Sequence, residues 1–307
     1  MTKRTGLIVT ALAAVYLAWG STYLGIRLAI HEMPPLFMCA VRFLIAGVLL
    51  IALGKLLREP WPTPTQWRGA AIAGILLLGL ANGGVTLSER SVPSGIAALI
   101  AAATPLTLMV IERLRPDGER PGRIGYLGLL VGFSGVAVLL GPAFSGSTLL
   151  GRPGDLALLF GAQFCWALGT SFSSRGPVPT GLFVGSGAQA LTAGLFHAVA
   201  TTVTGELPRA LGRSYDFQTW GAIGYLIVVG SFVGYTAYAF LVREVPPSLA
   251  SSNAYVNPVV AVILGTTIAQ EPMTPGILTG AALVVGAVAL LAYPQWLKAK
   301  ARRGATA

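Results

Sequence analysis

The chain has 307 residues, of which 54% are hydrophobic and 10% are charged, and its mean hydropathy is +0.72. A soluble domain carries about 25% charged residues, so this composition excludes a single soluble core and favours membrane spans of about 20 residues each. The net charge of +10 is a pattern that also occurs in nucleic-acid-binding proteins. Here the positions of the basic residues, given below, exclude nucleic acid as a partner.

Ten apolar runs of helical length follow one another along the chain. They cover residues 7–30, 35–56, 68–88, 93–114, 123–142, 153–174, 180–203, 217–241, 246–268 and 275–294. The runs lack the two-residue alternation of a membrane β-barrel strand. Because they occupy most of the chain, the sequence predicts an all-α polytopic membrane protein with ten transmembrane helices, partnered by the lipid bilayer.

The basic residues are concentrated on alternate loops. If the N-terminus is cytoplasmic, 15 of the 21 Lys and Arg residues fall on the cytoplasmic side and 5 on the other, and Arg42 lies within a run. This positive-inside bias predicts a multi-pass protein with both termini in the cytoplasm. Lys3 and Arg4 could also open a signal peptide, but "WGSTY" (residues 19–23) is no small-residue cleavage site, so we expect the first run to be retained.

The chain contains an internal repeat. With a shift of 153 residues, "RSVPSGIAALIAAATP" (residues 90–105) aligns with "REVPPSLASSNAYVNP" (residues 243–258), and six of sixteen positions are identical. A shift of 147 aligns Trp19 with Trp166, and a shift of 151 aligns Gly135 with Gly286. Five spans per copy is an odd number, so the second copy enters the membrane inverted. Inverted repeats are typical of transporters with a central substrate site.

These shifts divide the chain into four segments. We expect a first five-helix repeat over residues 1–142, a Gly-, Ser- and Pro-containing linker over 143–152, a second, inverted repeat over 153–296, and a basic cytoplasmic tail over 297–307. The two cysteines, Cys39 and Cys165, lie singly in different spans, so neither a disulfide nor a metal framework is expected. No cofactor is expected.

Several motifs together resemble the drug/metabolite transporter superfamily, in its ten-helix EamA-type branch. They are "AWGSTY" in the first run, "VRF" in the second, "VPSGIAAL" opening the fourth, "AYVNPVVAVILG" in the ninth and "EP" after it. The resemblance covers essentially the whole chain. It implies transport of small metabolites, often export, across a bacterial inner membrane, with helices 1, 3, 4, 6, 8 and 9 around a central cavity and helices 5 and 10 at the periphery.

Polar and aromatic residues at helical spacing mark the expected substrate site. The groups are Tyr16, Trp19 and Tyr23 with their repeat mates Gln163, Trp166 and Thr170; Asn82 with its mate Tyr235, and Tyr238; and Asn253 and Asn257, with Thr104 as the mate of Asn257. Trp and Tyr also occupy membrane-interface belts. Gln163 and Asn82 have a second interpretation, in which they tie helices together by hydrogen bonds.

Pro105 and Pro258 occupy the same position in the two repeats. A proline frees the carbonyl four residues earlier, and a freed carbonyl at membrane depth must be satisfied by protein or by water in a cavity. We therefore expect both prolines to interrupt their helices beside the cavity and to provide bendable points.

The charged residues near the membrane are few. Arg42 lies roughly 9 Å from the outer end of its span, where it either contacts a substrate carboxylate or has a structural role. Glu89, Glu112 and Glu271 lie at span ends and are expected to be solvated. His197 lies in the seventh span, where ordinary packing is the simpler interpretation and proton sensing is the alternative.

The sequence thus predicts an alternating-access transporter of small neutral or zwitterionic metabolites, amino acids among them, that works without obligatory proton coupling. If transport is coupled to protons after all, Glu89 and Glu271 are the residues expected to carry them. The alternatives are a proton-coupled multidrug or nucleoside exporter, an intramembrane enzyme, for which the spans lack mid-span carboxylates, and a channel. A monomer is expected, and a homodimer along the fifth and tenth spans remains open.

Overall fold

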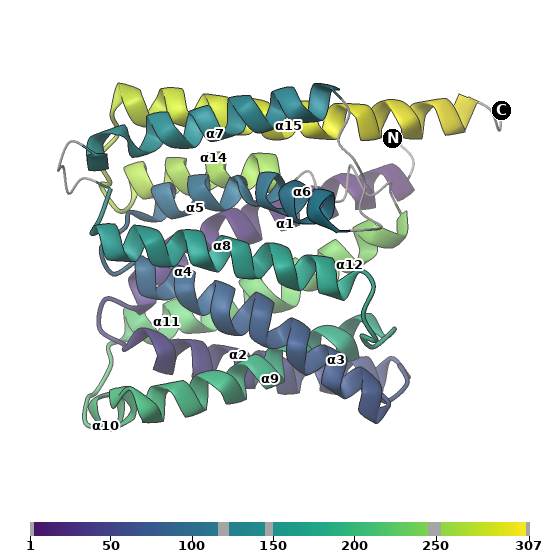
Figure 1. Cartoon of the computed structure of the whole chain (residues 1–307). Helices are drawn as coiled ribbons and strands as arrows, with labels where there is room; N and C mark the ends of the chain where they lie inside the picture. The colour runs from purple at the N-terminus through teal and green to yellow at the C-terminus, as the bar shows by residue number, and fades with distance from the viewer. Residues whose placement is uncertain (1–2, 116–122, 145–149, 245–252, 305–307) are drawn as a thin grey trace.

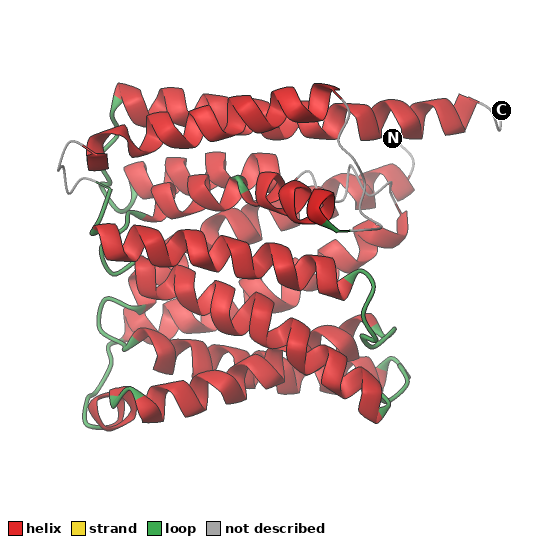
Figure 2. Ribbon diagram, viewed as in Figure 1, coloured by secondary structure: helices red, strands yellow, loops and turns green. Residues whose placement is uncertain are grey.

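The computed structural model describes residues 3–115, 123–144, 150–244 and 253–304. Figure 2 shows helices and loops throughout these residues. The helices are α1 (Lys3–Ala29), α2 (Pro35–Leu56), α3 (Pro64–Gly74), η1 (Ile75–Asn82), α4 (Gly83–Ser88), α5 (Ser94–Ala102), α6 (Thr104–Leu114), α7 (Arg123–Phe144), α8 (Pro153–Ser173), α9 (Leu182–Val203), α10 (Glu206–Leu211), α11 (Phe217–Tyr225), η2 (Leu226–Val233), α12 (Gly234–Glu244), α14 (Asn253–Thr267) and α15 (Pro275–Gly304). The protein is therefore an all-α polytopic membrane protein, as predicted.

Each predicted run coincides with one helix or with consecutive helices. Among the described residues, eight helices are long and apolar enough to cross a membrane, and two shorter apolar helices, Val256–Thr267 and Pro275–Ala287, belong to the ninth and tenth runs. Residues 246–252 of the ninth run lie outside the described residues. The helix α15 continues to Gly304, through most of the predicted basic tail. Several helices begin at a proline, where a missing N–H group costs nothing.

The two halves of the chain run in opposite directions through the bundle. The start of α1 and the end of α15 lie on the same side of the bundle (Figure 1). We call this side the termini end and the opposite side the far end. At the far end, Arg27 near the end of α1 contacts the main chain at Glu89, and Ser91 contacts Asp155 in the first turn of α8. The first span, α1, therefore ends on the side where the sixth span, α8, begins, as an inverted repeat requires.

Equivalent helices of the two halves pack against each other. The pair α2 and α9 forms one edge of the bundle, and the pair α7 and α15 lies along the opposite edge (Figure 1). The α7–α15 contact places the fifth and tenth spans at the periphery. Glycines allow close approach in both pairs: a Cβ at Gly47 would lie 2.6 Å from Leu191 N, and one at Gly135 would lie 2.7 Å from Leu283 Cβ.

Carboxylates from one half cap helices of the other half. Glu206, which follows α9, accepts hydrogen bonds from Leu36 N (2.9 Å) and Phe37 N (3.3 Å) at the start of α2. Glu59, which follows α2, accepts from Leu182, Phe183 and Val184 N at the start of α9. These two glutamates are 147 residues apart, which is one of the repeat shifts. A carboxylate at a helix N-terminus satisfies free N–H groups and complements the helix dipole, so the caps fasten the halves together.

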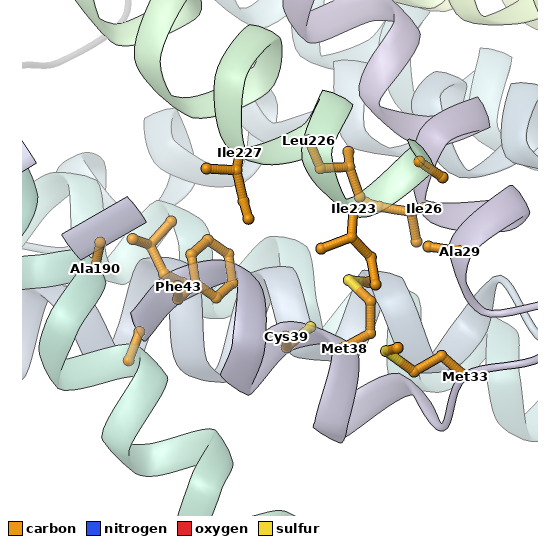
Figure 3. Close-up of a cluster of buried hydrophobic side chains, with 13 residues drawn as sticks. Ile26, Ala29, Met33, Met38, Cys39, Phe43, Ala190, Ile223, Leu226 and Ile227 are labelled. Atoms are coloured by element: carbon orange, nitrogen blue, oxygen red, sulfur yellow. The ribbon is translucent and has the colours of Figure 1, made fainter. Parts of the chain in front are cut away.

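A buried apolar cluster lies toward the far end, between α1, α2, η1, α9, α11 and η2. Figure 3 shows Met33, Met38, Cys39 and Phe43 meeting Ile223, Leu226 and Ile227 across this interface. Large apolar side chains on the outside of the bundle, such as Leu17, Val48, Phe133 and Val199, are exposed. In a membrane protein this outer surface faces lipid, so the polar groups inside the bundle are the candidates for a functional site.

Candidate functional site

Two π-helical segments lie in the third and eighth spans, at equivalent positions of the repeats. They are η1 and η2, which begin 151 residues apart, and the sequence analysis did not anticipate them. The pairs Gly79/Gly83 and Gly230/Gly234 have the same shift, and in each pair the first glycine lies within the π-helix and the second follows it directly. A π-helix changes the direction in which side chains point and often occurs at functional sites.

Trp19 joins the first span to the eighth. Its indole Nε1 donates a hydrogen bond to the Gly230 carbonyl oxygen (3.1 Å) inside η2. Its ring meets Tyr235 edge-on with centroids 5.8 Å apart, and Tyr238 at 5.1 Å. A Cβ at Gly234 would lie 2.4 Å from the indole nitrogen, so glycine makes room for the ring. The structure thus brings together three of the predicted site residues.

Arg42 is buried in the second span, with 5% of its surface exposed. Its Nε and Nη1 atoms are buried and have no hydrogen-bond partner among the described residues. The guanidinium carbon lies 5.0 Å from the centre of the Phe43 ring, and Nη2 would lie 3.4 Å from a Cβ at Gly230. A buried cation without an anion is costly, so the unused donors of Arg42 are poised for an acceptor.

Two asparagine side chains of the predicted site also have unused acceptors. The Oδ1 atoms of Asn82, at the end of η1, and of Asn257, in α14, are buried without a hydrogen-bond partner in the described part of the chain. Buried polar atoms are nearly always paired. Together with Arg42, these atoms form a set of unsatisfied donors and acceptors on the second, third and ninth spans.

Thr104 and Gln163 contact each other across the halves. Thr104 Oγ1 lies 2.8 Å from Gln163 Oε1 and 2.6 Å from the Ala101 carbonyl oxygen. That carbonyl is the one that Pro105 deprives of its helical donor, and the helix is indeed interrupted between α5 and α6. The contact agrees with the helix-tying interpretation of Gln163.

The second proline behaves differently from the first. Pro258 lies inside α14, which continues past it to Thr267. The interruption expected at this position is therefore absent from the described helix, while its mate Pro105 lies in the first turn of α6. The residue before the proline also differs: it is Thr104, whose hydroxyl donates to the Ala101 carbonyl oxygen, in one half and Asn257 in the other.

The remaining predicted residues are spread over the same helices. Tyr23 packs against the apolar cluster around Val85, Val92 and Ile96 rather than beside Trp19. Trp166, the mate of Trp19, is 38% exposed. The Thr170 hydroxyl donates to the Trp166 carbonyl oxygen (2.9 Å). Tyr16 and Asn253 are partly buried. Thus the structure does not group these residues as closely as Trp19, Tyr235 and Tyr238.

The carboxylates at the span ends are not all solvated, contrary to the sequence expectation. Glu89 is 1% exposed, and the Glu271 side chain is 6% exposed. Glu112 is bound by Arg175 (2.7 Å) and Ser171 (2.5 Å) at the termini end. The loops fold back over the helix ends, and this burial cannot be inferred from position along the chain. Sequence reasoning missed Glu206 and Glu59 entirely, although their 147-residue spacing was a usable signal.

Two further features lie away from this site. His197 is fully buried, with Nε2 3.1 Å from the Leu78 carbonyl oxygen and its ring stacked at 6.0 Å on Phe43. A hollow of about 400 Å³ lies among loops, lined by His31, Glu32, Gly212, Arg213, Ser214 and Tyr215. It contains none of the predicted site residues.

In the described residues, membrane-length helices form two halves of opposite direction and carry buried unsatisfied polar groups, an arrangement typical of a membrane transporter. The model of the EamA-like transporter family matches residues 5–141 and again residues 153–293. This chain belongs to the EamA-like transporter family, within the drug/metabolite transporter superfamily. The match points to a transporter rather than an enzyme.

Similar proteins cover nearly the full chain. "Uncharacterized inner membrane transporter YedA" of Escherichia coli strain K12 is 38% identical over 288 residues, covering 94% of this chain and 91% of that protein. "Uncharacterized transporter YvbV" of Bacillus subtilis strain 168 is 27% identical over 298 residues, with the same coverage. A solved crystal structure matches with a TM-score of 0.61 at 20% identity, covering 92% of this chain and 95% of that one, which shows a shared fold.

Proposed function

We propose that this transporter moves small zwitterionic or neutral metabolites, amino acids in particular, by alternating access through a site between its two halves. The direction we propose is export across the inner membrane, which is common among transporters of this superfamily. We place both termini in the cytoplasm because of the positive-inside bias of the loops. The far end is then the outer end.

The buried, unpaired guanidinium of Arg42 carries this proposal. Arg binds carboxylates through paired, charge-assisted hydrogen bonds, and Nε and Nη1 are the unused donors. The acceptors of Asn82 and Asn257 suit an ammonium group, and the faces of Trp19 and Tyr235 attract cations. A zwitterion with an apolar side chain has a group that suits each of these side chains.

Exchange of amino acids in proteoliposomes is expected to depend on the substrate carboxylate. Removing one partner of a buried charged pair costs about 2–5 kcal/mol, or about 30-fold or more in affinity. Counterflow should therefore fall by at least that factor for the carboxamide analogue of a transported amino acid. It should fall similarly for an Arg42→Met variant, and less for Arg42→Lys, which keeps the charge.

The matched control is Arg68→Met, which removes an exposed arginine of α3 and should leave counterflow unchanged. Equal exchange of the acid and its carboxamide would contradict the role of Arg42. Exchange of nucleosides or cationic drugs in place of amino acids would favour the alternative exporter class.

A further inference from the structure

The Glu89 carboxyl lies in an unusual environment at the far end. It is the first residue after the span Pro64–Ser88. Its side chain is 1% exposed, and both carboxyl oxygens are buried without a hydrogen-bond partner among the described residues. An ionised carboxylate is very costly in such a place, so the carboxyl is neutral when the far end has this arrangement.

Arg27 contacts the main chain of Glu89 and forms no hydrogen bond with its carboxyl group. Arg27 Nη1 donates to the main-chain oxygens of Glu89 (3.0 Å) and Val92 (3.3 Å), and Arg27 Nε lies 3.5 Å from Glu271 Oε1. Glu271 also accepts from Ser94 N (2.6 Å) and Gly95 N (2.9 Å) at the start of α5. Both Glu271 carboxyl oxygens therefore have partners, and Arg27 already contacts Glu271 and the main chain beside Glu89.

The other charged and titratable groups around Glu89 act in both directions. Burial is the largest influence and raises the pKa of the Glu89 carboxyl well above its ordinary value of 4.5; Arg27 and Arg42 oppose this rise, and Glu271 adds to it. The groups that face Glu89 are Tyr23 and Arg27 of α1, Cys39 and Arg42 of α2, and Glu271 between α14 and α15.

We propose that Glu89 is a proton-binding site of the transporter, which takes up a proton when the far end closes and releases it when that end opens. The inference rests on the proposed alternating access. Arg27 and Glu271 make contact beside the buried Glu89, and in this proposal separation of that contact admits water to the carboxyl. The proposal differs from the expectation of flux without obligatory proton coupling, because it links closure of the far end to one proton.

The sign of the linkage follows from the direction of the shift. The closed far end binds one proton more than the open end at every pH between the ordinary pKa and the raised one. Closure is therefore favoured at low external pH and is lost progressively as the pH rises through this window. The opening equilibrium changes by at most about tenfold per pH unit for a single proton.

The test measures opening of the far end without any substrate, so it is independent of the transport proposal. A single cysteine replaces Val92, which is fully buried at this end, in a Cys39→Ala, Cys165→Ala background in proteoliposomes. A membrane-impermeant maleimide labels it at several external pH values. Labelling of a cysteine at exposed Ser214 corrects for the pH dependence of thiol reactivity.

Corrected labelling at position 92 should rise with pH by up to about tenfold per unit. Glu89→Gln, which mimics the protonated acid, should label slowly at every pH, and Glu89→Asp should keep the pH dependence. Glu112→Gln, at the opposite end, is the matched control and should keep it too. The proposal would be overturned if labelling at position 92 did not change with pH when Glu89 is present. An unaltered pH dependence in Glu89→Gln would overturn it too.

Discussion

Replacing Asn257 by leucine is expected to reduce substrate exchange strongly while leaving the folded protein at least as stable as before. Asn257 Oδ1 is buried without a partner in the described residues, and an unsatisfied buried acceptor costs about 1–3 kcal/mol. Leucine has a similar size and removes that cost. Loss of a hydrogen bond to substrate of the same magnitude would reduce exchange by about 5- to 140-fold.

The measurement combines counterflow with the thermal unfolding midpoint of the purified variant. Gln218→Leu, an exposed position at the start of α11, is the control and should alter neither quantity. A variant that unfolds at a clearly lower temperature would show that Asn257 has a structural role. Normal exchange by a stable variant would remove Asn257 from the site.

Replacing Gly47 by alanine is expected to destabilise the protein, although alanine is the better helix former. The added Cβ would lie 2.6 Å from Leu191 N, 2.9 Å from Leu191 Cα and 3.0 Å from the Gly187 carbonyl oxygen. These are main-chain atoms of α9 and cannot rotate away, so α2 and α9 must separate. Overpacking of this kind costs about 1–3 kcal/mol or more.

Gly161→Ala is the matched control, because a Cβ at Gly161 in α8 meets nothing within 4 Å. There only helix propensity changes, and it favours alanine by about 0.8–1.0 kcal/mol. Thermal unfolding in one detergent should therefore shift downward for Gly47→Ala and upward for Gly161→Ala. Equal shifts in the two variants would mean that the α2–α9 interface tolerates the added methyl group.

The sequence was informative about the site where helical spacing alone brings residues together. Tyr235 and Tyr238 are three residues apart, and Trp19 was expected to face the same region; the three rings are in contact. The expectation that both prolines interrupt their helices was wrong for Pro258, which lies inside the continuous α14, while Pro105 follows the break between α5 and α6.

By itself, the sequence determined the class, the spans, the repeat and the family, because apolar length, charge on loops and fixed residue shifts are local or linear properties. Only the tertiary structure decided which polar groups are paired and which are left over. Glu206 accepts a hydrogen bond from Leu36, 170 residues earlier, and Glu271 accepts one from Ser94, 177 residues earlier. In contrast, the carboxyl oxygens of Glu89 and the Nε and Nη1 atoms of Arg42 have no hydrogen-bond partner among the described residues. Such pairing depends on distance in space, so the chain must be folded before an unsatisfied group can be recognised.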